Sequence, residues 1–241
     1  MITLHSVSKV IGSKRFQRTI ARDITWSIEP RSKLVILGHR REALSVFLNM
    51  IVGVTVPSEG WIERTGTFSM PGGFLHLSMG RTPRHLIDFL APLYRFEPSQ
   101  VADFVEACVK YDRLLDIPIA QLPLVLRREL NMVLIYAIPC DYYVFDGSPE
   151  GGGRNEIRAL CRRALNARSE KSGVIIGTGS ARTAKILGPE ANGAILYQGS
   201  LTVYRYVEDA LAVFEGLEPE ETIPRESMEE EHEGEEYDLI V

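Results

Sequence analysis

The sequence has few cysteines and no long apolar run. Its three cysteines, Cys108, Cys140 and Cys161, show neither a CxxC pattern nor the spacing of metal ligands. Such an odd, sparse set is typical of a reduced cytosolic chain and argues against a disulfide scaffold. No stretch approaches the ~20 apolar residues that span a bilayer, and the opening MITLHSVSKV lacks the apolar segment of a signal peptide. We therefore expect a cytoplasmic protein with no transmembrane segment of its own.

Positive charge is scarce at one end of the chain. Residues 215–241 hold 12 Asp and Glu against one Arg, a net charge of −11. This leaves 26 basic and 20 acidic residues, a net charge of +6, in residues 1–214. A strongly acidic, weakly apolar segment buries too little surface to offset its ordering entropy. We expect one folded domain over 1–214, followed by an acidic, disordered tail over 215–241.

Paired histidines are also missing, and so are aromatic residues in the most basic predicted helix. The five histidines lie far apart without an i, i+4 pair, so we expect no metal site. The most basic stretch, Arg154–Arg168, contains no aromatic residue, so we expect no nucleic-acid partner. We interpret it as a solvated basic face; the alternative is that the acidic tail folds back on it.

Hydrophobic patterns divide the domain into strands and helices. Alternating or continuous apolar runs predict strands at residues 2–9, 20–28, 33–37, 61–64, 141–146, 173–176, 193–197 and 200–204. Helical spacing predicts helices at 42–52, 82–93, 98–111, 127–136, 155–168, 181–187 and 207–214. Early antiparallel strands followed by buried strands separated by helices indicate an α/β fold with a parallel core sheet. Ligands of such sheets bind at the carboxyl ends of strands, here after Leu37, Asp146 and Ile176.

The order of these segments resembles the ATP-binding subunits of ABC transporters, and most closely those of capsular and O-antigen polysaccharide export. The resemblance rests on segments whose order and spacing match: MITLHSVSK, KLVILG, VPSEGWI, GGF at 72–74, LSMGR, DYYVFD and AILYQGSL. It implies an ABC-type P-loop NTPase-like fold with an antiparallel β subdomain, a parallel core sheet and a helical subdomain at about 78–135.

The phosphate-binding position keeps little of the family's chemistry. The family has a G-x-x-x-x-G-K-[ST] loop there, whose backbone N–H groups and lysine hold phosphates while its hydroxyl binds Mg²⁺. This chain has GHRREALS: Gly38 and Ser45 remain, but leucine replaces the lysine. Arg40 and Arg41 stand in the loop and could bind an anion; the alternative is that both are merely solvated. No Gly-Lys-Ser or Gly-Lys-Thr occurs in the chain.

Other family positions have changed as well. Asp146 matches the Mg²⁺-binding aspartate of the second motif, but Gly147 follows it where the family has a catalytic glutamate. Further positions of the resemblance hold residues without the family's side chains: Gly179 for the switch histidine, LPLVLRR at 122–128 for the Ser-Gly-Gly-Gln run, Leu75 for the Q-loop glutamine, Ile11 for the adenine-stacking aromatic and Gly153 for the D-loop aspartate.

These losses favour a pseudo-ATPase, a docking or regulatory subunit of polysaccharide export that is not a competent ATPase. Gly38, Arg40, Arg41, Ser45 and Asp146 are its residual nucleotide-site residues. Such a subunit would dock through residues 78–135 on an ABC permease, at the inner face of the cell membrane, and form a homodimer or pair with a second ATP-binding subunit. One alternative is an active ATPase with an atypical site, and only that alternative needs ATP and Mg²⁺. Another is a soluble scaffold in polysaccharide assembly.

Overall fold

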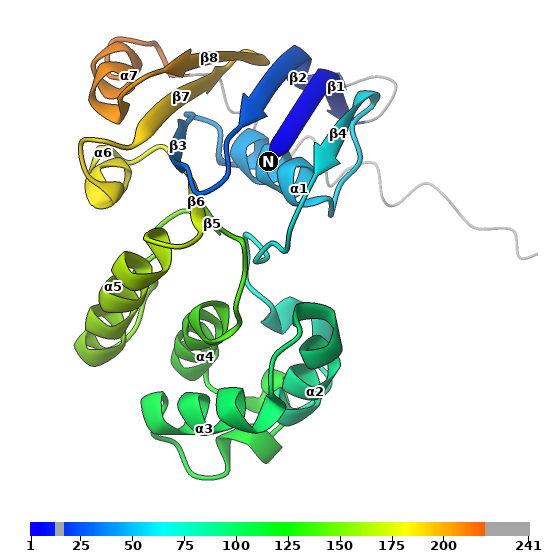
Figure 1. Ribbon diagram of the computed structural model, residues 1–241, viewed down its shortest axis with the longest axis vertical. Coiled ribbons are helices and arrows are strands. Elements are labelled where there is room, and N and C mark those ends of the chain that lie inside the picture. The colour runs from blue at the N-terminus through cyan, green and yellow to red at the C-terminus, as the bar shows by residue number, and fades with distance from the viewer. Residues whose placement is uncertain (13–16, 220–241) are drawn as a thin grey trace, which may run out of the picture.

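The computed structural model describes residues 1–12 and 17–219 and shows two lobes, one built on sheets and one on helices (Figure 1). The middle of the connection expected at 12–18 and most of the acidic tail, residues 220–241, lie outside the described residues. In the described part of the chain, no helix is both long and apolar enough to cross a membrane.

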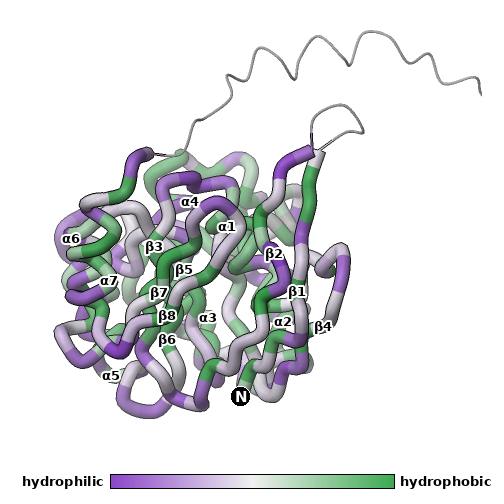
Figure 2. The backbone as a smooth tube through the Cα atoms, turned by 90° about the horizontal axis from the view of Figure 1, so that it is seen from above, coloured by the Kyte–Doolittle hydropathy of each residue, from purple (hydrophilic) through white to green (hydrophobic). Residues whose placement is uncertain are grey.

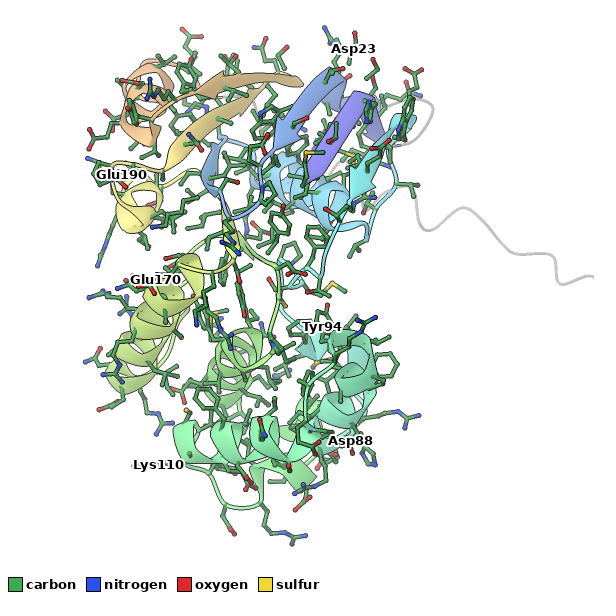
Figure 3. All side chains as sticks on the ribbon, in the orientation of Figure 1. Asp23, Asp88, Tyr94, Lys110, Glu170 and Glu190 are labelled. Atoms are coloured by element: carbon green, nitrogen blue, oxygen red, sulfur yellow. The ribbon has the colours of Figure 1, made fainter. Side chains whose placement is uncertain are left out.

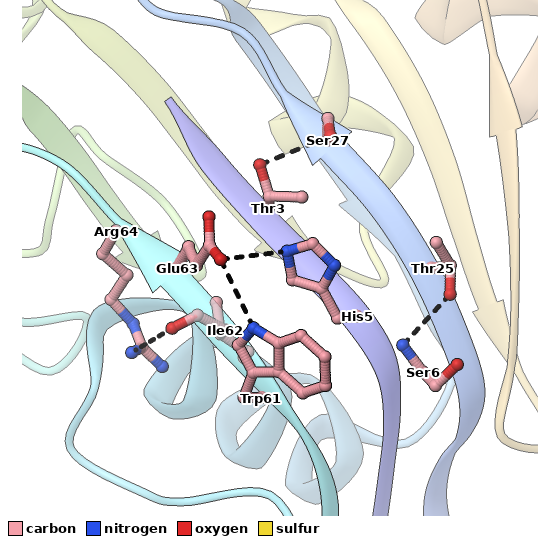
Figure 4. A network of polar contacts seen from close by, with 9 residues as sticks. All are labelled: Thr3, His5, Ser6, Thr25, Ser27, Trp61, Ile62, Glu63 and Arg64. Carbon is pink, nitrogen blue, oxygen red and sulfur yellow. Dashed lines mark hydrogen bonds and ion pairs between the residues drawn. The ribbon is translucent and has the colours of Figure 1, made fainter.

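A small antiparallel sheet opens the chain. Its strands are β1 (Ile2–Gly12), β2 (Gln17–Ile28) and β4 (Glu59–Arg64), in the order β2-β1-β4. Ile2, Leu4 and Val7 of β1 are fully buried against the core. The alternation that the sequence predicts holds at Ile2 and Leu4, and a register shift in the pairing with β2 lies between Leu4 and Val7. The opposite face carries a polar network in which His5 stacks on Trp61 with ring centroids 4.7 Å apart (Figure 4).

The second sheet has five strands in the order β5-β6-β3-β7-β8. Strands β5 (Tyr142–Asp146), β6 (Gly173–Thr178), β3 (Lys33–Leu37) and β7 (Asn192–Tyr197) run parallel, and β8 (Ser200–Tyr204) pairs antiparallel with β7. All six residues of β6 are buried, which explains its continuous apolar character. The predicted α/β class and parallel core sheet are confirmed.

Helix α1 (Arg41–Val52) lies between the two sheets. Its apolar side chains, among them Phe47 and Leu48, share one core with β1, β2 and the middle strands of the parallel sheet. Two features end the helix. Gly53 adopts a left-handed conformation at φ 88°. The guanidinium of Arg64 donates hydrogen bonds to the terminal carbonyls of Met50 and Ile51 at 2.5 and 2.8 Å. Strand β4 thus positions the helix that carries Ser45.

Three further helices cover the face of the parallel sheet that points away from α1. Helix α5 (Asn155–Ser169) follows β5, while α6 (Ala181–Ala184) with the 3₁₀ turn η4 (Lys185–Leu187) follows β6. Helix α7 (Val207–Phe214) packs against β7 and β3. In the hydropathy view, green apolar segments run through the centre of the molecule and purple ones along its outer turns (Figure 2).

The helical lobe consists of η1 (Leu75–Ser78), α2 (Pro83–Tyr94), α3 (Pro98–Cys108), η2 (Leu114–Asp116), η3 (Ile119–Gln121) and α4 (Leu124–Ala137). Thr82 caps α2 as expected, because its hydroxyl accepts from the N–H of His85 at 3.4 Å. The core of this lobe continues into α5 and one face of β5 and β6, so the lobes share buried side chains.

Element bounds differ from the predictions at the ends of both strands and helices. Strand β1 runs on to Gly12 instead of residue 9, and β2 begins at Gln17 instead of residue 20. The predicted bounds 33–37 and 207–214 match β3 and α7. Helix α3 ends at Cys108 instead of residue 111, and α4 begins at Leu124 instead of residue 127. The reason for the second difference is that Pro123 fits just before a first turn, where a missing N–H costs nothing.

Candidate functional site

The segment at the phosphate-loop position is mostly helix. Only Gly38, His39 and Arg40 separate β3 from α1, because the helix already begins at Arg41. Arg40 is extended at φ −88°, ψ 105°, and its carbonyl accepts from the N–H of Leu44 at 3.2 Å. The N–H of residue 44, which stands where the family has its lysine, is therefore used inside the helix and does not point into an open loop.

The backbone is closely packed where this segment meets β6. The N–H of Gly38 donates to the carbonyl of Thr178 at 3.3 Å. A Cβ placed on Gly179 would lie 2.9 Å from the carbonyl oxygen of Gly38, which is too close for any side chain without a shift. A histidine at position 179 would therefore push the ends of β3 and β6 apart.

Leu44 occupies the lysine position as a core side chain. It is 2 % exposed and belongs to the core between the sheets. Its Cγ lies 3.1 Å from where a Cβ on Gly38 would stand. Residue 44 therefore points into the packed interior, away from any bound anion.

The two arginines at this position differ. Arg40 is partly buried, and one of its terminal nitrogens is enclosed with no hydrogen-bond partner among the described residues. Arg41 is exposed, and neither arginine forms an ion pair within 1–12 and 17–219. Glu42, by contrast, is paired with Arg18 of β2 at 2.9 Å. Nδ1 of His39 is likewise enclosed without a hydrogen-bond partner among the described residues, so Arg40 and His39 both keep unused hydrogen-bonding capacity.

Ser45 and Asp146, two of the residues assigned to the residual nucleotide site from the sequence, are in contact in the structure. The hydroxyl of Ser45 donates to Oδ2 of Asp146 at 2.5 Å, joining α1 to the end of β5. Both side chains carry the hard oxygen atoms that Mg²⁺ prefers. Gly147 follows at φ 98°, with its N–H on the carbonyl of Gly177 at 2.9 Å. No group that could act as a base stands at that position.

His39 packs against α7, a contact that the sequence did not predict. Its ring stacks on Phe214 of α7 with centroids 4.2 Å apart and an interplanar angle of 19°. Tyr197 approaches the same ring edge-on at 6.3 Å. These residues are far apart in the chain, so no local pattern could have revealed the contact. The short segment after β3 is thereby packed on its outer side.

The loop after Asp146 is anchored by charges and one hydroxyl. The hydroxyl of Tyr136 donates to the carbonyl of Pro149 at 2.7 Å. The backbone N–H and the guanidinium of Arg154 donate hydrogen bonds of 2.8 to 3.1 Å to the fully buried carboxylate of Glu129. Burial raises the pKa of Glu129, but the hydrogen bonds and charge of Arg154 outweigh it, so the pKa lies below its usual value.

A second ion pair holds the same loop. Arg162 donates to Glu150 at 2.7 Å. This hydrogen bond lowers the pKa of Glu150 against the effect of burial, and the charges of Arg162, Arg158 and Arg182 lower it further. The GGG segment at 151–153 thus lies between two residues that are held by ion pairs, Glu150 and Arg154.

The loop at the Q-loop position is clamped to α4. The amide of Asn131 donates to the carbonyl of Gly72 at 3.0 Å, and its oxygen accepts from the N–H of Leu75 at 3.3 Å. Gly73, between them, adopts φ 83°, and a Cβ there would lie 2.0 Å from the Asn131 amide. Leu75 itself is 6 % exposed and belongs to the helical core.

The remaining predicted positions are structural in this molecule. Ile11 packs against the core between the sheets. Pro123 precedes α4, which has no side-chain cap, and Leu124 and Val125 are each 53 % exposed. Within the described residues, no group of three His, Cys, Asp or Glu could hold a metal ion.

Comparison with known proteins places the fold. No protein-family model matches the chain. It is 28% identical over 147 residues to the capsule polysaccharide export ATP-binding protein CtrD of Neisseria meningitidis serogroup B, and 24% identical to the ATP-binding protein BexA of Haemophilus influenzae. Each match covers 61% of this chain and 68% of the relative.

Solved structures agree over a longer span. The dimeric ATP-binding cassette MJ0796, bound to ADP and Pi, superposes with a TM-score of 0.67 at 13% identity, over 84% of this chain and 98% of that one. An ATP-binding subunit of an ABC transporter gives a TM-score of 0.68 at 15% identity, over 89% and 93% of the two chains. The chain therefore has the fold of an ABC ATPase and resembles the ATP-binding subunits of ABC transporters.

Proposed function

We propose that this chain is a non-catalytic ABC-type subunit of polysaccharide export that docks on or regulates a transporter. The names of the two relatives support the process. One observation supports the loss of catalysis: α1 begins at Arg41, so helix replaces most of the loop that would hold nucleotide phosphates. Residues 1–214 form its ABC-like domain in this proposal, with a helical subdomain at about 78–135.

The residues at the site do not fit a bound nucleotide. Phosphate cradles need several free N–H groups and a cation, yet the N–H of residue 44 is bonded to Arg40 and the side chain of Leu44 is buried. Phosphoryl transfer depends on such charge stabilisation. Ser45 and Asp146 suit Mg²⁺, but their hydrogen bond serves as an internal link between α1 and β5 instead.

Catalytic assistance is also absent from the positions that supply it in the family. Gly147 cannot act as a general base, and Gly179 leaves no room for a side chain beside Gly38. Steady hydrolysis would thus lack a lysine, a base and a histidine together. Their combined loss supports a structural role for the fold.

The proposed partner is an ABC permease at the inner face of the membrane, with a homodimer or a second ATP-binding subunit completing the complex. Phe89 and Leu93 lie one helical turn apart on α2 and are 60 % and 58 % exposed, and Leu77 nearby in the chain is 44 % exposed. Exposed apolar side chains grouped in this way are typical of protein contacts. They lie in the helical lobe expected to dock.

The environment of Arg40 supports one alternative function, that of an ATPase with an atypical site. Its enclosed, unpartnered nitrogen lies beside the start of α1, where an anion would be favourable. An atypical ATPase could use this arginine in place of the lysine. The absence of a base at Gly147 counts against turnover, although it does not affect anion binding.

Calorimetry and steady-state hydrolysis with Mg-ATP separate these functions. We expect no heat of binding and no hydrolysis above that of an Asp146→Ala control. Mg-dependent turnover that disappears in Asp146→Ala would contradict the proposal. Binding without turnover that is lost in Arg40→Gln but kept in Arg41→Gln would establish the anion site instead.

Membrane association separates a transporter subunit from a soluble scaffold. We expect the chain to co-purify with a polytopic membrane protein and to lose it when Phe89 and Leu93 are both changed to serine. Val203→Ser on β8, where Val203 is 47 % exposed, is the matched control and should change nothing. A chain that stays in the soluble fraction in every case would favour the scaffold.

A further inference from the structure

Positive charge gathers on one side of the molecule. Residues 154–185 contain eight Arg and Lys against two Glu, a net charge of +6, as large as that of residues 1–214 together. They form α5, β6, α6 and the start of η4. In Figures 1 and 2, α5, α6 and α7 lie along the same side of the molecule.

The basic side chains of α5 and α6 meet around one carboxylate. Glu150 is bonded to Arg162 at 2.7 Å and is also influenced by the charges of Arg158 and Arg182. One carboxylate among three guanidiniums leaves an excess of two positive charges. We call the exposed group the arginine face; it consists of Arg158, Arg162, Arg163, Arg182 and Lys185.

Only Arg162 of this face has an ion-pair partner among residues 1–12 and 17–219. The acidic residues on neighbouring positions, Glu156, Glu170 and Glu190, offset the charge only in part. Figure 3 shows Glu170 beside α5 and Glu190 beside α6. On its inner side α5 buries Ile157, Cys161 and Leu165, whereas Arg158, Arg162 and Arg163 are exposed to solvent.

The chain outside the described residues carries the opposite charge. Residues 220–241 contain ten Asp and Glu and one Arg, a net charge of −9. The described chain continues past α7, and Leu217 packs on the same small core as Ala184 of α6. The last described residues of the chain therefore belong to the same core as one helix of the arginine face. Its 22 residues can reach up to about 70 Å, against about 22 Å for the length of α5.

We propose that residues 220–241 bind to the arginine face of their own chain. This interaction surface goes beyond the transporter role and does not depend on it. Two observations support it: the charges are complementary, and four of the five side chains of the face have no ion-pair partner among the described residues. The contacts are exposed, so the binding is sensitive to salt, with a Debye length of about 10 Å at 0.1 M and about 3 Å at 1 M ionic strength. An acidic partner protein would compete with the segment for the same face.

Zero-length carbodiimide cross-linking of the full chain tests this at low ionic strength. The reagent joins lysine amines to carboxylates, so Lys185 reports on the arginine face. We expect Lys185 to link to glutamates of 220–241 within one chain, and the links to disappear at high salt. Lys110, which is exposed at the far end of the helical lobe, is the internal control and should not link (Figure 3).

Matched double substitutions show which charges matter. Changing Arg158 and Arg182 to glutamine should lower the yield of Lys185 links roughly fivefold, since each exposed ion pair contributes about 0.2–1 kcal/mol. Changing Arg22 and Arg81, which are exposed elsewhere, should leave the yield unchanged. The proposal is wrong if Lys185 and Lys110 link equally, if the first pair of changes has no effect, or if the links join two chains.

Discussion

The hydroxyl of Ser45 lies 2.5 Å from Oδ2 of Asp146 and joins the first turns of α1 to the end of β5. Both residues were expected from the resemblance to serve a bound metal ion. In this molecule they satisfy each other directly. The contact connects the helix between the sheets to the central parallel sheet, so its removal has a consequence for stability that can be measured.

Ser45→Ala should lower the free energy of unfolding by about 1.5 kcal/mol, because a hydrogen bond to a charged group is lost from a partly buried position. Urea unfolding followed by circular dichroism measures the change. Addition of Mg²⁺ should not change the unfolding midpoint of the unmodified chain. A midpoint that rises with Mg²⁺ and no longer does so in Ser45→Ala would mean that the pair is a metal site after all.

Introducing a lysine at position 44 should lower the free energy of unfolding without producing ATP hydrolysis. Leu44→Lys places an amine at a position that is 2 % exposed and surrounded by apolar side chains. We expect a loss of about 3 kcal/mol or more from burial of the charged group. Leu44→Met, the size-matched control, should cost about 1 kcal/mol.

Ala43→Gly combined with Leu44→Lys rebuilds the family's Gly-Lys-Ser pattern at 43–45. We expect no Mg-ATP hydrolysis, since Gly147 still provides no base. A thermal shift with Mg-ATP measures nucleotide binding, and a phosphate-release assay measures hydrolysis. If this variant were stabilised by Mg-ATP, the α1 start at Arg41 would be a consequence of the missing residues and not a fixed feature of the fold.

The loop that Asn131 clamps should tolerate no side chain at Gly73. Gly73→Ala combines a left-handed backbone with a Cβ 2.0 Å from the Asn131 amide, so we expect a loss of about 2–3 kcal/mol. Gly53 has a similar φ of 88° in the left-handed region, and a Cβ there would lie 3.5 Å from its nearest neighbour, so its alanine variant should lose about 1 kcal/mol. Gly152, with neither constraint, should change by less than about 0.5 kcal/mol. Equal losses at Gly73 and Gly53 would mean that the contact with Asn131 contributes nothing.

Most of the fold could be predicted because its signals are local. Continuous apolar runs such as 33–37 and 173–176 identify buried parallel strands, and the meeting of Ser45 with Asp146 follows from their places after β3 and at the end of β5. Two other contacts join segments that are distant in the chain: His39 stacks on Phe214, and Arg154 is hydrogen-bonded to Glu129. Both depend on the three-dimensional packing of helices, for which sequence spacing gives no signal.

The start of α1 could be predicted to within one residue, because helix was expected from Glu42 and begins at Arg41. Alanine and leucine at 43 and 44 favour helix, whereas glycine at 43 would oppose it. Ala43 and Leu44 are therefore compatible with a helix that begins at Arg41. The burial of the Leu44 side chain depends on the packing of α1 between the sheets, for which the sequence gives no signal.

The pair of Glu129 and Arg154 should give a pH-dependent stability. The pKa of Glu129 is below its ordinary value of about 4.3 because Arg154 outweighs burial. The unfolded chain therefore takes up this proton first as the pH falls. The pair's contribution to stability is complete above about pH 4.3 and is lost as the pH drops toward the lower, folded-state pKa.

Substituting each partner separates charge from burial. Arg154→Ala leaves a carboxylate with 0 % side-chain exposure and no cation, so we expect a loss of about 3 kcal/mol at neutral pH. Burial then dominates the pKa of Glu129, which rises, so this variant should regain stability relative to the unmodified chain as the medium is acidified. Glu129→Gln leaves an arginine that is 46 % exposed and should cost about 1 kcal/mol. Its unfolding free energy should fall less steeply with acid than that of the unmodified chain, and parallel slopes for all three proteins would show that Glu129 is not the titrating group.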